Sequence, residues 1–391
     1  MNTNITNEHD KKQRIQITAV CTVVVSLFCA AIFGVFILAA IMHDREKSET
    51  ENRVLKQFPK FSFSALFDGS FMKNFETYFN DQFPFRDGLI TLKTKIDRSV
   101  GKSEENGVYI GKDGFLFEAP TKPDNSRISE LSKAVTAFSK DNKKLKKAFI
   151  LSPNASDILP EKLPAALKLE DRSDSFSKIK NGISGISWVD CKGIFEKQED
   201  KSALFYRTDH HWTTRAAYLP FKELSSLWKL GAKDKNYSFY TVSSSFQGTL
   251  SSSAAVKDTT DKIEICVPKK QTEKYTVLYE SSDRKTASLF EEEKLNQKNQ
   301  YEVFLGGNYD KVIISTAADT AAALLVFKDS YANCMLPMLT PYFSKIVVID
   351  PRYFSDSLKA VMSETKFTHV LFLYNMDTFL GDTSLVSTLE S

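Results

Sequence analysis

The 391-residue sequence has no strong excess of charge, because 52 Lys and Arg residues oppose 49 Asp and Glu residues and leave a formal net charge of +3. It also lacks a basic stripe with interleaved aromatic residues, so its composition does not favour nucleic-acid binding. Its five cysteines show no C-x-x-C spacing, which argues against a zinc site and against a disulfide framework. We expect Cys191, Cys266 and Cys334 to be buried thiols, although one disulfide among them stays open.

One long apolar run is present, and it lies near the N-terminus. Residues 15–42 contain no charged side chain, and about 20 apolar residues suffice to cross a bilayer. Three basic residues close the preceding segment 1–14, whereas the segment after the run, Asp44–Lys47, is nearly balanced in charge. The positive-inside rule then predicts a cytoplasmic tail, a transmembrane anchor and an external body. A cleaved signal peptide is the alternative, but its apolar region is typically only 7–15 residues long, so we favour an uncleaved anchor.

The rest of the chain predicts one α/β domain over residues 61–391, after a linker over 43–60. Apolar residues at helical spacing predict helices around 67–79 and 89–96 and over 131–147, and turn residues predict a β-hairpin over 107–117. Short apolar runs that end in polar residues alternate with helices, which is typical of a parallel sheet. These runs are 148–151, 183–189, 312–315, 322–327, 346–349 and 370–374. A Ser-, Thr-, Lys- and Glu-rich stretch over 231–299 predicts a β-rich insertion packed against this core.

The residues that carry chemistry are Asp209 and His211, together with Ser330 far downstream. A serine hydroxyl becomes a nucleophile when a histidine takes its proton, and a carboxylate must hold that histidine in one tautomer. Ser330 follows a predicted strand and precedes a predicted helix, where helix N-terminal amides could stabilise an oxyanion. The alternative is that Asp329 and Ser330 form an ordinary helix N-cap.

A metal site is the other hypothesis for the adjacent pair His210 and His211. We expect neighbouring side chains to point apart, and the sequence shows no second carboxylate cluster, so we predict no metal here. His210 is expected to be structural.

The segment Tyr206–Thr213 resembles the signature of the DHHW family. Further matches are Glu51-Asn52-Arg53, Asp81–Asp87, Phe304–Asn308 and Lys328–Tyr331. That family is similar to the alginate O-acetyltransferase proteins of the SGNH-hydrolase-like superfamily, in which the Asp-x-His motif precedes the serine. The resemblance implies a three-layer SGNH-hydrolase-like domain in which Asp209 orients, His211 is the base and Ser330 is the nucleophile.

Four further residues are candidates for supporting roles, and each has a structural alternative. Asn308 could donate to an oxyanion or simply occupy a left-handed turn. Arg352 could bind a substrate carboxylate or hold the active-site loops together, or it could form an ion pair with Asp350 or Asp329. Tyr331 and Trp212 could form a wall on which a sugar stacks, or they could belong to the core.

The resemblance implies O-acetylation of an exopolysaccharide or cell-wall glycan outside the membrane, with no cofactor. It also implies a partner, a membrane-bound O-acyltransferase that delivers acetyl groups. A carbohydrate O-acetyl esterase with the same three residues is the first alternative, because the sequence does not separate a sugar acceptor from water. A non-enzymatic scaffold of a polysaccharide synthesis complex is the second.

Overall fold

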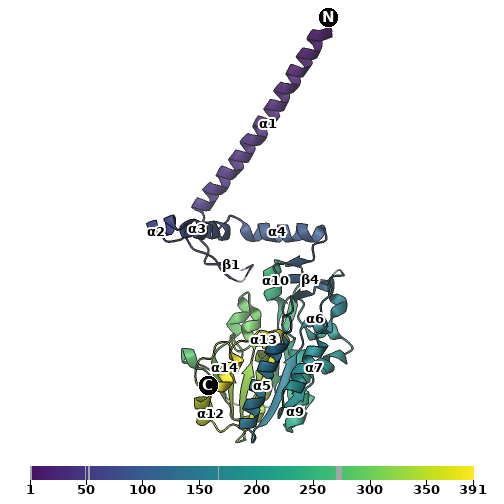
Figure 1. Cartoon of the computed structure of the whole chain (residues 1–391), viewed down its shortest axis with the longest axis vertical. Coiled ribbons are helices and arrows are strands. Elements are labelled where there is room, and N and C mark those ends of the chain that lie inside the picture. The colour runs from purple at the N-terminus through teal and green to yellow at the C-terminus, as the bar shows by residue number, and fades with distance from the viewer. Residues whose placement is uncertain (1, 49, 52, 166, 270–274) are drawn as a thin grey trace. The chain divides into compact units, whose positions relative to one another are not determined.

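The computed structural model describes residues 2–48, 50–51, 53–165, 167–269 and 275–391. Its contacts divide the chain into two compact units, Met1–Lys93 and Thr94–Ser391, which are described separately below (Figure 1). Residues 61–93, which we predicted to be part of the α/β domain, therefore belong with the N-terminal segment.

The first unit begins with a long helix, α1 (Asn2–Ile41). Its stretch Gln13–Ile41 has a mean hydropathy of 2.8 and is long and apolar enough to cross a membrane. The helix extends through the polar residues before this stretch, which we had treated as a separate tail. The remaining elements of the unit are β1 (Lys47–Ser48), β2 (Arg53–Val54), α2 (Phe63–Phe67), α3 (Ser70–Asp81) and the first half of α4 (Arg86–Ser99). The predicted linker 43–60 thus contains a short antiparallel strand pair.

The second unit is built on an eight-stranded sheet in the order β11-β10-β12-β14-β13-β15-β6-β7. Five strands are mutually parallel, as predicted: β14 (Lys345–Ile349), β13 (Ala323–Lys328), β15 (His369–Asn375), β6 (Lys146–Ser152) and β7 (Ser187–Val189). The other three are added through antiparallel pairings, β12 (Lys311–Ser315) on β14, β10 (Thr276–Tyr279) on β12 and β11 (Arg284–Thr286) on β10. The prediction that the 312–315 strand joins a parallel sheet is therefore wrong in direction.

Helices cover both faces of the sheet, which confirms the three-layer prediction (Figure 1). Alternate residues of each strand point to opposite faces: Leu324 and Val326 of β13 belong to one core, whereas Leu325 and Phe327 belong to the other. One core includes residues of α8 (Cys191–Glu196), α9 (Thr214–Trp228) and α11 (Leu336–Leu339). The other includes residues of α5 (Asn125–Asp141), α7 (Ser173–Gly182), α12 (Leu358–Glu364), α13 (Met376–Gly381) and α14 (Leu385–Glu390).

The predicted hairpin and insertion are both present, with one difference in how the insertion packs. Strands β3 (Glu104–Glu105), β4 (Val108–Ile110) and β5 (Leu116–Glu118) form an antiparallel sheet. Within 231–299, β8 (Tyr237–Phe246) and β9 (Asp261–Pro268) form an antiparallel ribbon, and α10 (Thr249–Ala254) lies between them in sequence. The insertion also supplies β10 and β11, which extend the main sheet through hydrogen bonds.

Two predicted boundaries are wrong. The helix predicted over 131–147 ends at Asp141, with Asn142 as its C-cap, and Lys146 and Lys147 already belong to β6. Lys147 is buried, and its Nζ donates to the carbonyl oxygens of Ser139 and Asn142, which closes the helix-to-strand turn. The strand predicted over 183–189 is limited to β7, because Gly185 turns the chain with a φ of 73°.

Candidate functional site

The carboxyl ends of the parallel strands position Ser330. It begins a short 3-10 helix (Ser330–Cys334) directly after β13, and Asp329 caps this helix by accepting a hydrogen bond from the Tyr331 N–H at 2.9 Å. The other carboxylate oxygen of Asp329 accepts from the Asn375 N–H at the end of β15, at 2.7 Å. The N-cap alternative for Asp329 is therefore present, and it fixes the turn that carries the serine.

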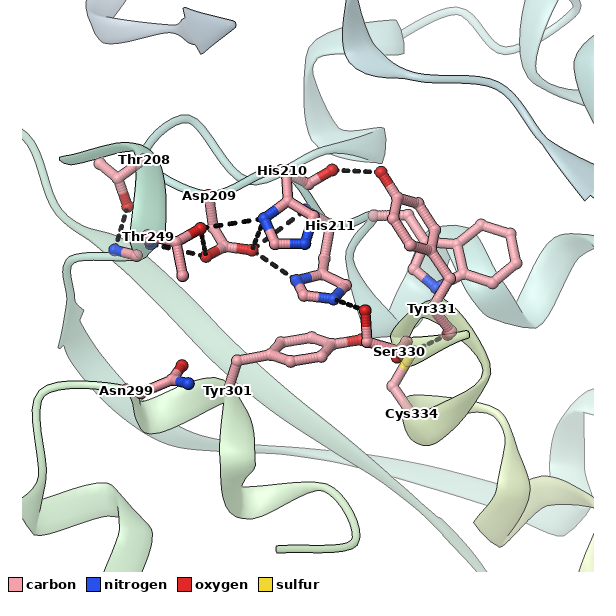
Figure 2. A network of polar contacts seen from close by, with 12 residues as sticks. Thr208, Asp209, His210, His211, Thr249, Asn299, Tyr301, Ser330, Tyr331 and Cys334 are labelled. Carbon is pink, nitrogen blue, oxygen red and sulfur yellow. Dashed lines mark hydrogen bonds and ion pairs between the residues drawn. The ribbon is translucent and has the colours of Figure 1, made fainter. Parts of the chain in front are cut away.

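Asp209, His211 and Ser330 are brought together across 119 positions of sequence (Figure 2). His211 Nδ1 lies 2.6 Å from Asp209 Oδ1, and His211 Nε2 lies 2.8 Å from Ser330 Oγ. Both distances are within hydrogen-bond reach. The arrangement can relay a proton from the serine to the imidazole while the carboxylate holds the ring.

Burial and charge keep His211 neutral and Asp209 ionised. Burial and the neighbouring His210 lower the pKa of His211 to about 4, although Asp209 acts in the opposite direction. Burial alone would raise the pKa of Asp209, but His210, His211 and a hydrogen bond from Thr249 outweigh it and hold the pKa well below its usual range. A neutral imidazole beside a carboxylate is the form that can accept a proton from Ser330, which is only partly buried.

Two residues that the sequence analysis missed complete this geometry. The Tyr301 ring stacks on the His211 ring with centroids 3.7 Å apart, and its hydroxyl donates to the Ser330 carbonyl at 3.3 Å. Thr249 donates to Asp209 Oδ2 through its N–H at 2.8 Å and its hydroxyl at 3.0 Å. Neither residue stands in a recognisable motif, and only the tertiary fold brings them to the site.

Gly248 lets the insertion approach Asp209. A Cβ atom at Gly248 would lie 2.3 Å from both Cβ and Oδ2 of Asp209, far closer than real Cβ contacts. We therefore expect Gly248→Ala to displace the carboxylate and to lower the free energy of unfolding by about 1–3 kcal/mol, as overpacking does. Thermal denaturation tests this, with Gly381→Ala as the control, because Gly381 has no atom within 4 Å of its added Cβ. Equal melting temperatures for the two variants would contradict the packing argument.

We expected the neighbouring side chains of His210 and His211 to point apart, which argued against a metal, and that expectation is wrong. The two rings lie side by side with centroids 3.9 Å apart, and Asp209, His210 and His211 offer ligand atoms within 4.8 Å of one another. Both nitrogens of His211 are, however, engaged by Asp209 and Ser330, and His210 Nδ1 lies 2.9 Å from Thr249 Oγ1. An ion would have to displace these contacts, and the expected absence of a metal stays a prediction.

Asn308 has its amide oriented by buried neighbours. Its Oδ1 accepts from Lys328 Nζ at 3.0 Å and from Asn333 Nδ2 at 3.3 Å, so its NH2 group is turned away from both. Lys328 is fully buried and pairs with Asp350 at 3.3 Å. Left-handed backbone occurs at Leu305, Gly306 and Gly307 and not at Asn308, so the left-handed-turn alternative for this residue is wrong.

Arg352 forms the ion pair that we considered as its structural alternative. Its Nε and Nη2 atoms lie 2.8 and 2.7 Å from the two carboxylate oxygens of Asp350. Arg352 also lines an open cavity of about 500 Å³ next to the site. A role toward substrate therefore stays a prediction.

The proposed sugar-stacking wall of Trp212 and Tyr331 is wrong. Trp212 is 0% exposed and Tyr331 is 1% exposed, so neither ring has a free face. The Trp212 indole N–H donates to the Tyr331 carbonyl at 2.9 Å, and the Tyr331 hydroxyl donates to the His210 carbonyl. These aromatic residues instead brace the loop that carries His211 against the turn that carries Ser330.

The cavity beside the site has a polar lining and opens next to His210. The residues around it are Glu118, His210, Arg352, Asn375, Asp377, Thr378, Gly381, Asp382, Thr383 and Ser384. Such a surface offers hydroxyl, amide and carboxylate groups, and its lining includes His210, the sequence neighbour of His211, but neither His211 nor Ser330. It is suited chemically to a ligand that carries several hydroxyl groups.

Comparison with known proteins agrees with this fold. Residues 51–109 match the family model described as DHHW protein. The chain is 27% identical over 175 residues to "Probable alginate O-acetylase AlgJ" of Pseudomonas aeruginosa, a match that covers 42% of this chain and 44% of the relative. It is 25% identical over 187 residues to the protein of the same name from Pseudomonas syringae pv. tomato, covering 44% and 47%. The matches thus span less than half the length of these relatives.

Two solved structures share the fold at low sequence identity. A DHHW family protein from Eubacterium siraeum has a TM-score of 0.62 and 22% identity, and the match covers 73% of this chain and 96% of that one. Bacillus cereus PatB1 with a sulfonyl adduct has a TM-score of 0.60 and 16% identity, covering 72% and 99%.

A second family model matches residues 108–305, a little over half of the chain, and is described as SGNH hydrolase-like domain, acetyltransferase AlgX. The matched segment contains Asp209 and His211 and ends before Ser330, whose part in the site rests on the geometry given above. By the extent of this match and by its three-layer fold, the chain belongs to the family of SGNH hydrolase-like domains of the acetyltransferase AlgX type.

Proposed function

We propose that this protein is a serine-dependent O-acetyltransferase that modifies an exopolysaccharide or cell-wall glycan outside the membrane. The single observation that carries the proposal is the His211 imidazole, which bridges Asp209 at 2.6 Å and Ser330 Oγ at 2.8 Å. Membership of the family and the name of the Pseudomonas relatives support acetyl transfer as the reaction.

In the proposed mechanism, His211 takes the Ser330 proton as the hydroxyl attacks the acetyl carbonyl of a donor, and the donor's leaving group departs with that proton. The acetyl group is then an ester on Ser330. A sugar hydroxyl next attacks this ester while His211 removes its proton, and His211 returns that proton to the departing Ser330 oxygen, which restores the serine hydroxyl. The Asn308 NH2 group, oriented by Lys328 and Asn333, is our candidate for stabilising the negative charge on the carbonyl oxygen.

We place the acceptor sugar in the cavity beside His210. Its polar lining supports this choice, since a sugar there could hydrogen-bond to several walls at once. A transferase must hold the acceptor hydroxyl where water would otherwise attack, and such positioning supplies much of the selectivity.

The proposed location follows from α1. Its stretch Gln13–Ile41 would cross the membrane with the basic N-terminal segment in the cytoplasm, and the second unit, Thr94–Ser391, would act outside. A membrane-bound O-acyltransferase that passes acetyl groups outward is the partner that this arrangement requires.

Acetyl transfer can be measured directly on an oligosaccharide. We expect the purified protein to cleave a small activated acetyl ester slowly and to move acetate onto an added glycan oligosaccharide, as detected by mass spectrometry of the sugar. Release of acetate from an acetylated glycan, with no acetylated product from several acceptors, would identify an esterase instead. A folded protein that turns over no ester would contradict the proposal and favour a scaffold.

The low pKa of His211 predicts an unusually acidic limit of activity. The base works when neutral, so kcat/KM for ester cleavage should stay high as pH falls and should be lost only near pH 4. His210 contributes to the low pKa of His211, so His210→Gln should move the acidic limb of the profile to higher pH while most of kcat remains. If His210→Gln is as inactive as His211→Ala in a folded protein, the metal hypothesis must be reopened.

A further inference from the structure

The motifs Glu51-Asn52-Arg53 and Asp81–Asp87 lie outside the catalytic site, and they fold the segment after α1 back on itself. Arg53 donates to both carboxylate oxygens of Asp81, at 2.9 and 2.6 Å, and Asp81 is 5% exposed. Arg86 pairs with Glu51 through both guanidinium Nη atoms. Asn52 lies outside the described residues. These ion pairs hold the segment after α1 against the end of α3 and the start of α4.

Other contacts hold α3 against the end of α1. The Tyr78 hydroxyl donates to Asp44 Oδ1 at 2.9 Å, and the Arg45 N–H donates to Gln82 Oε1 at 2.9 Å. The Phe36 ring, about one turn before the end of α1, stacks on Phe79 with centroids 5.6 Å apart. If α1 crosses a membrane, α3 therefore lies at the level where the apolar part of that crossing ends.

The helices of this unit present large apolar side chains to their surroundings. In α2, Phe63 is 71% exposed and Phe67 is 85% exposed, and Phe85, just before α4, is 71% exposed. Further exposed apolar residues of this unit are Phe58, Phe61, Leu66, Met72, Leu89 and Leu92. This density is far above the scattered apolar residues of an ordinary water-exposed surface.

We infer that α2, α3 and the first half of α4 form an interfacial layer, which lies in the headgroup region of the same bilayer that α1 crosses. The inference rests on α1 crossing the membrane and is independent of the reaction at Ser330. The occupant of the apolar surface is lipid, because the contacts of Asp44, Arg45 and Phe36 tether the helices to the end of the apolar span. Exposed basic residues such as Lys56 and Lys60 suit anionic headgroups.

The layer would give the protein a second attachment to the membrane besides α1. A single helix allows the chain beyond it to rotate and tilt, whereas a set of amphipathic helices in the interface fixes the depth of the first unit. Phenylalanine side chains are suited to this position, since their rings pack into the boundary between headgroups and acyl chains.

The test uses the full chain in phospholipid vesicles, with the exposed Cys21 and Cys29 replaced by Ala. Cys191, Cys266 and Cys334 are buried, so an added surface cysteine is the one that is labelled. An environment-sensitive fluorophore is attached at Phe67→Cys and, separately, at Leu92→Cys. Lys73→Cys is the matched control, because Lys73 lies on the α3 face opposite Phe71, Phe75 and Tyr78 and is exposed. Circular dichroism of each variant checks that the fold is kept.

We expect blue-shifted emission at positions 67 and 92 and loss of most of that fluorescence when the vesicles contain a lipid with a quencher near its headgroup. The Lys73→Cys reporter should stay water-like and lose much less fluorescence. Water-like emission at all three positions, or blue-shifted emission that lipid quenchers leave unchanged, would overturn the inference and indicate a protein partner. Ester turnover measured on the same samples reports on the proposed reaction separately.

Discussion

Ser330→Ala should abolish ester turnover, with kcat falling by about 10⁴-fold or more, because the variant has no nucleophile and retains only the binding and polarising groups. The Ser330 hydroxyl meets His211 Nε2 at 2.8 Å, and its loss removes no backbone contact, so the fold should remain. Steady-state hydrolysis of an activated acetyl ester measures the effect.

Ser253→Ala is the matched control for this variant. Ser253 is an exposed serine of α10 in the same unit, and it has no part in the proposed relay. Its kcat should equal that of the unchanged protein. If Ser330→Ala kept a substantial fraction of the activity, another group would have to be the nucleophile.

Asp209→Asn should reduce kcat by about 10⁴-fold, through the tautomer of His211. The carboxylate accepts hydrogen bonds from His211 on one oxygen and from Thr249 on the other. An asparagine turns its NH2 group toward one of these donors. When the NH2 group faces His211, the ring must carry its proton on Nε2 and cannot accept the Ser330 proton. When the NH2 group faces Thr249, it opposes the Thr249 N–H, which is also a donor.

Asp261→Asn separates this effect from the general loss of a buried carboxylate. Asp261 is 8% exposed and accepts from the Thr208 N–H at 2.8 Å and the Thr208 hydroxyl at 2.6 Å, next to the motif but without contact to His211. We expect both variants to lose thermal stability and only Asp209→Asn to lose most of its kcat. Similar kcat values for the two variants would remove Asp209 from its proposed role.

The sequence predicted the parts of the fold that depend on local patterns. Apolar runs that end in polar residues identified the parallel strands, and the position of Ser330 after one of them located the site at the carboxyl edge of the sheet. The direction of β12 was missed, because its strand pattern is the same for either direction and only its neighbours β10 and β14 decide it.

The errors within the site have a common physical cause. Trp212 follows His211 directly, yet in the folded chain His211 faces Ser330 while Trp212 enters the core. Tyr301 and Thr249 reach His211 and Asp209 only through tertiary packing. Spacing along the chain cannot reveal a ring that stacks from a different segment.

The most direct test of the central claim is to trap the acyl-enzyme. The protein is mixed with an activated acetyl ester, stopped with acid within one turnover, digested and analysed by mass spectrometry. The proposed mechanism predicts one acetyl group on the peptide that contains Ser330. The acetylated fraction should be lower in His211→Ala than in the unchanged protein, and it should be zero in Ser330→Ala. Ester turnover with no acetyl group on Ser330, or with the label on another residue, would contradict the account.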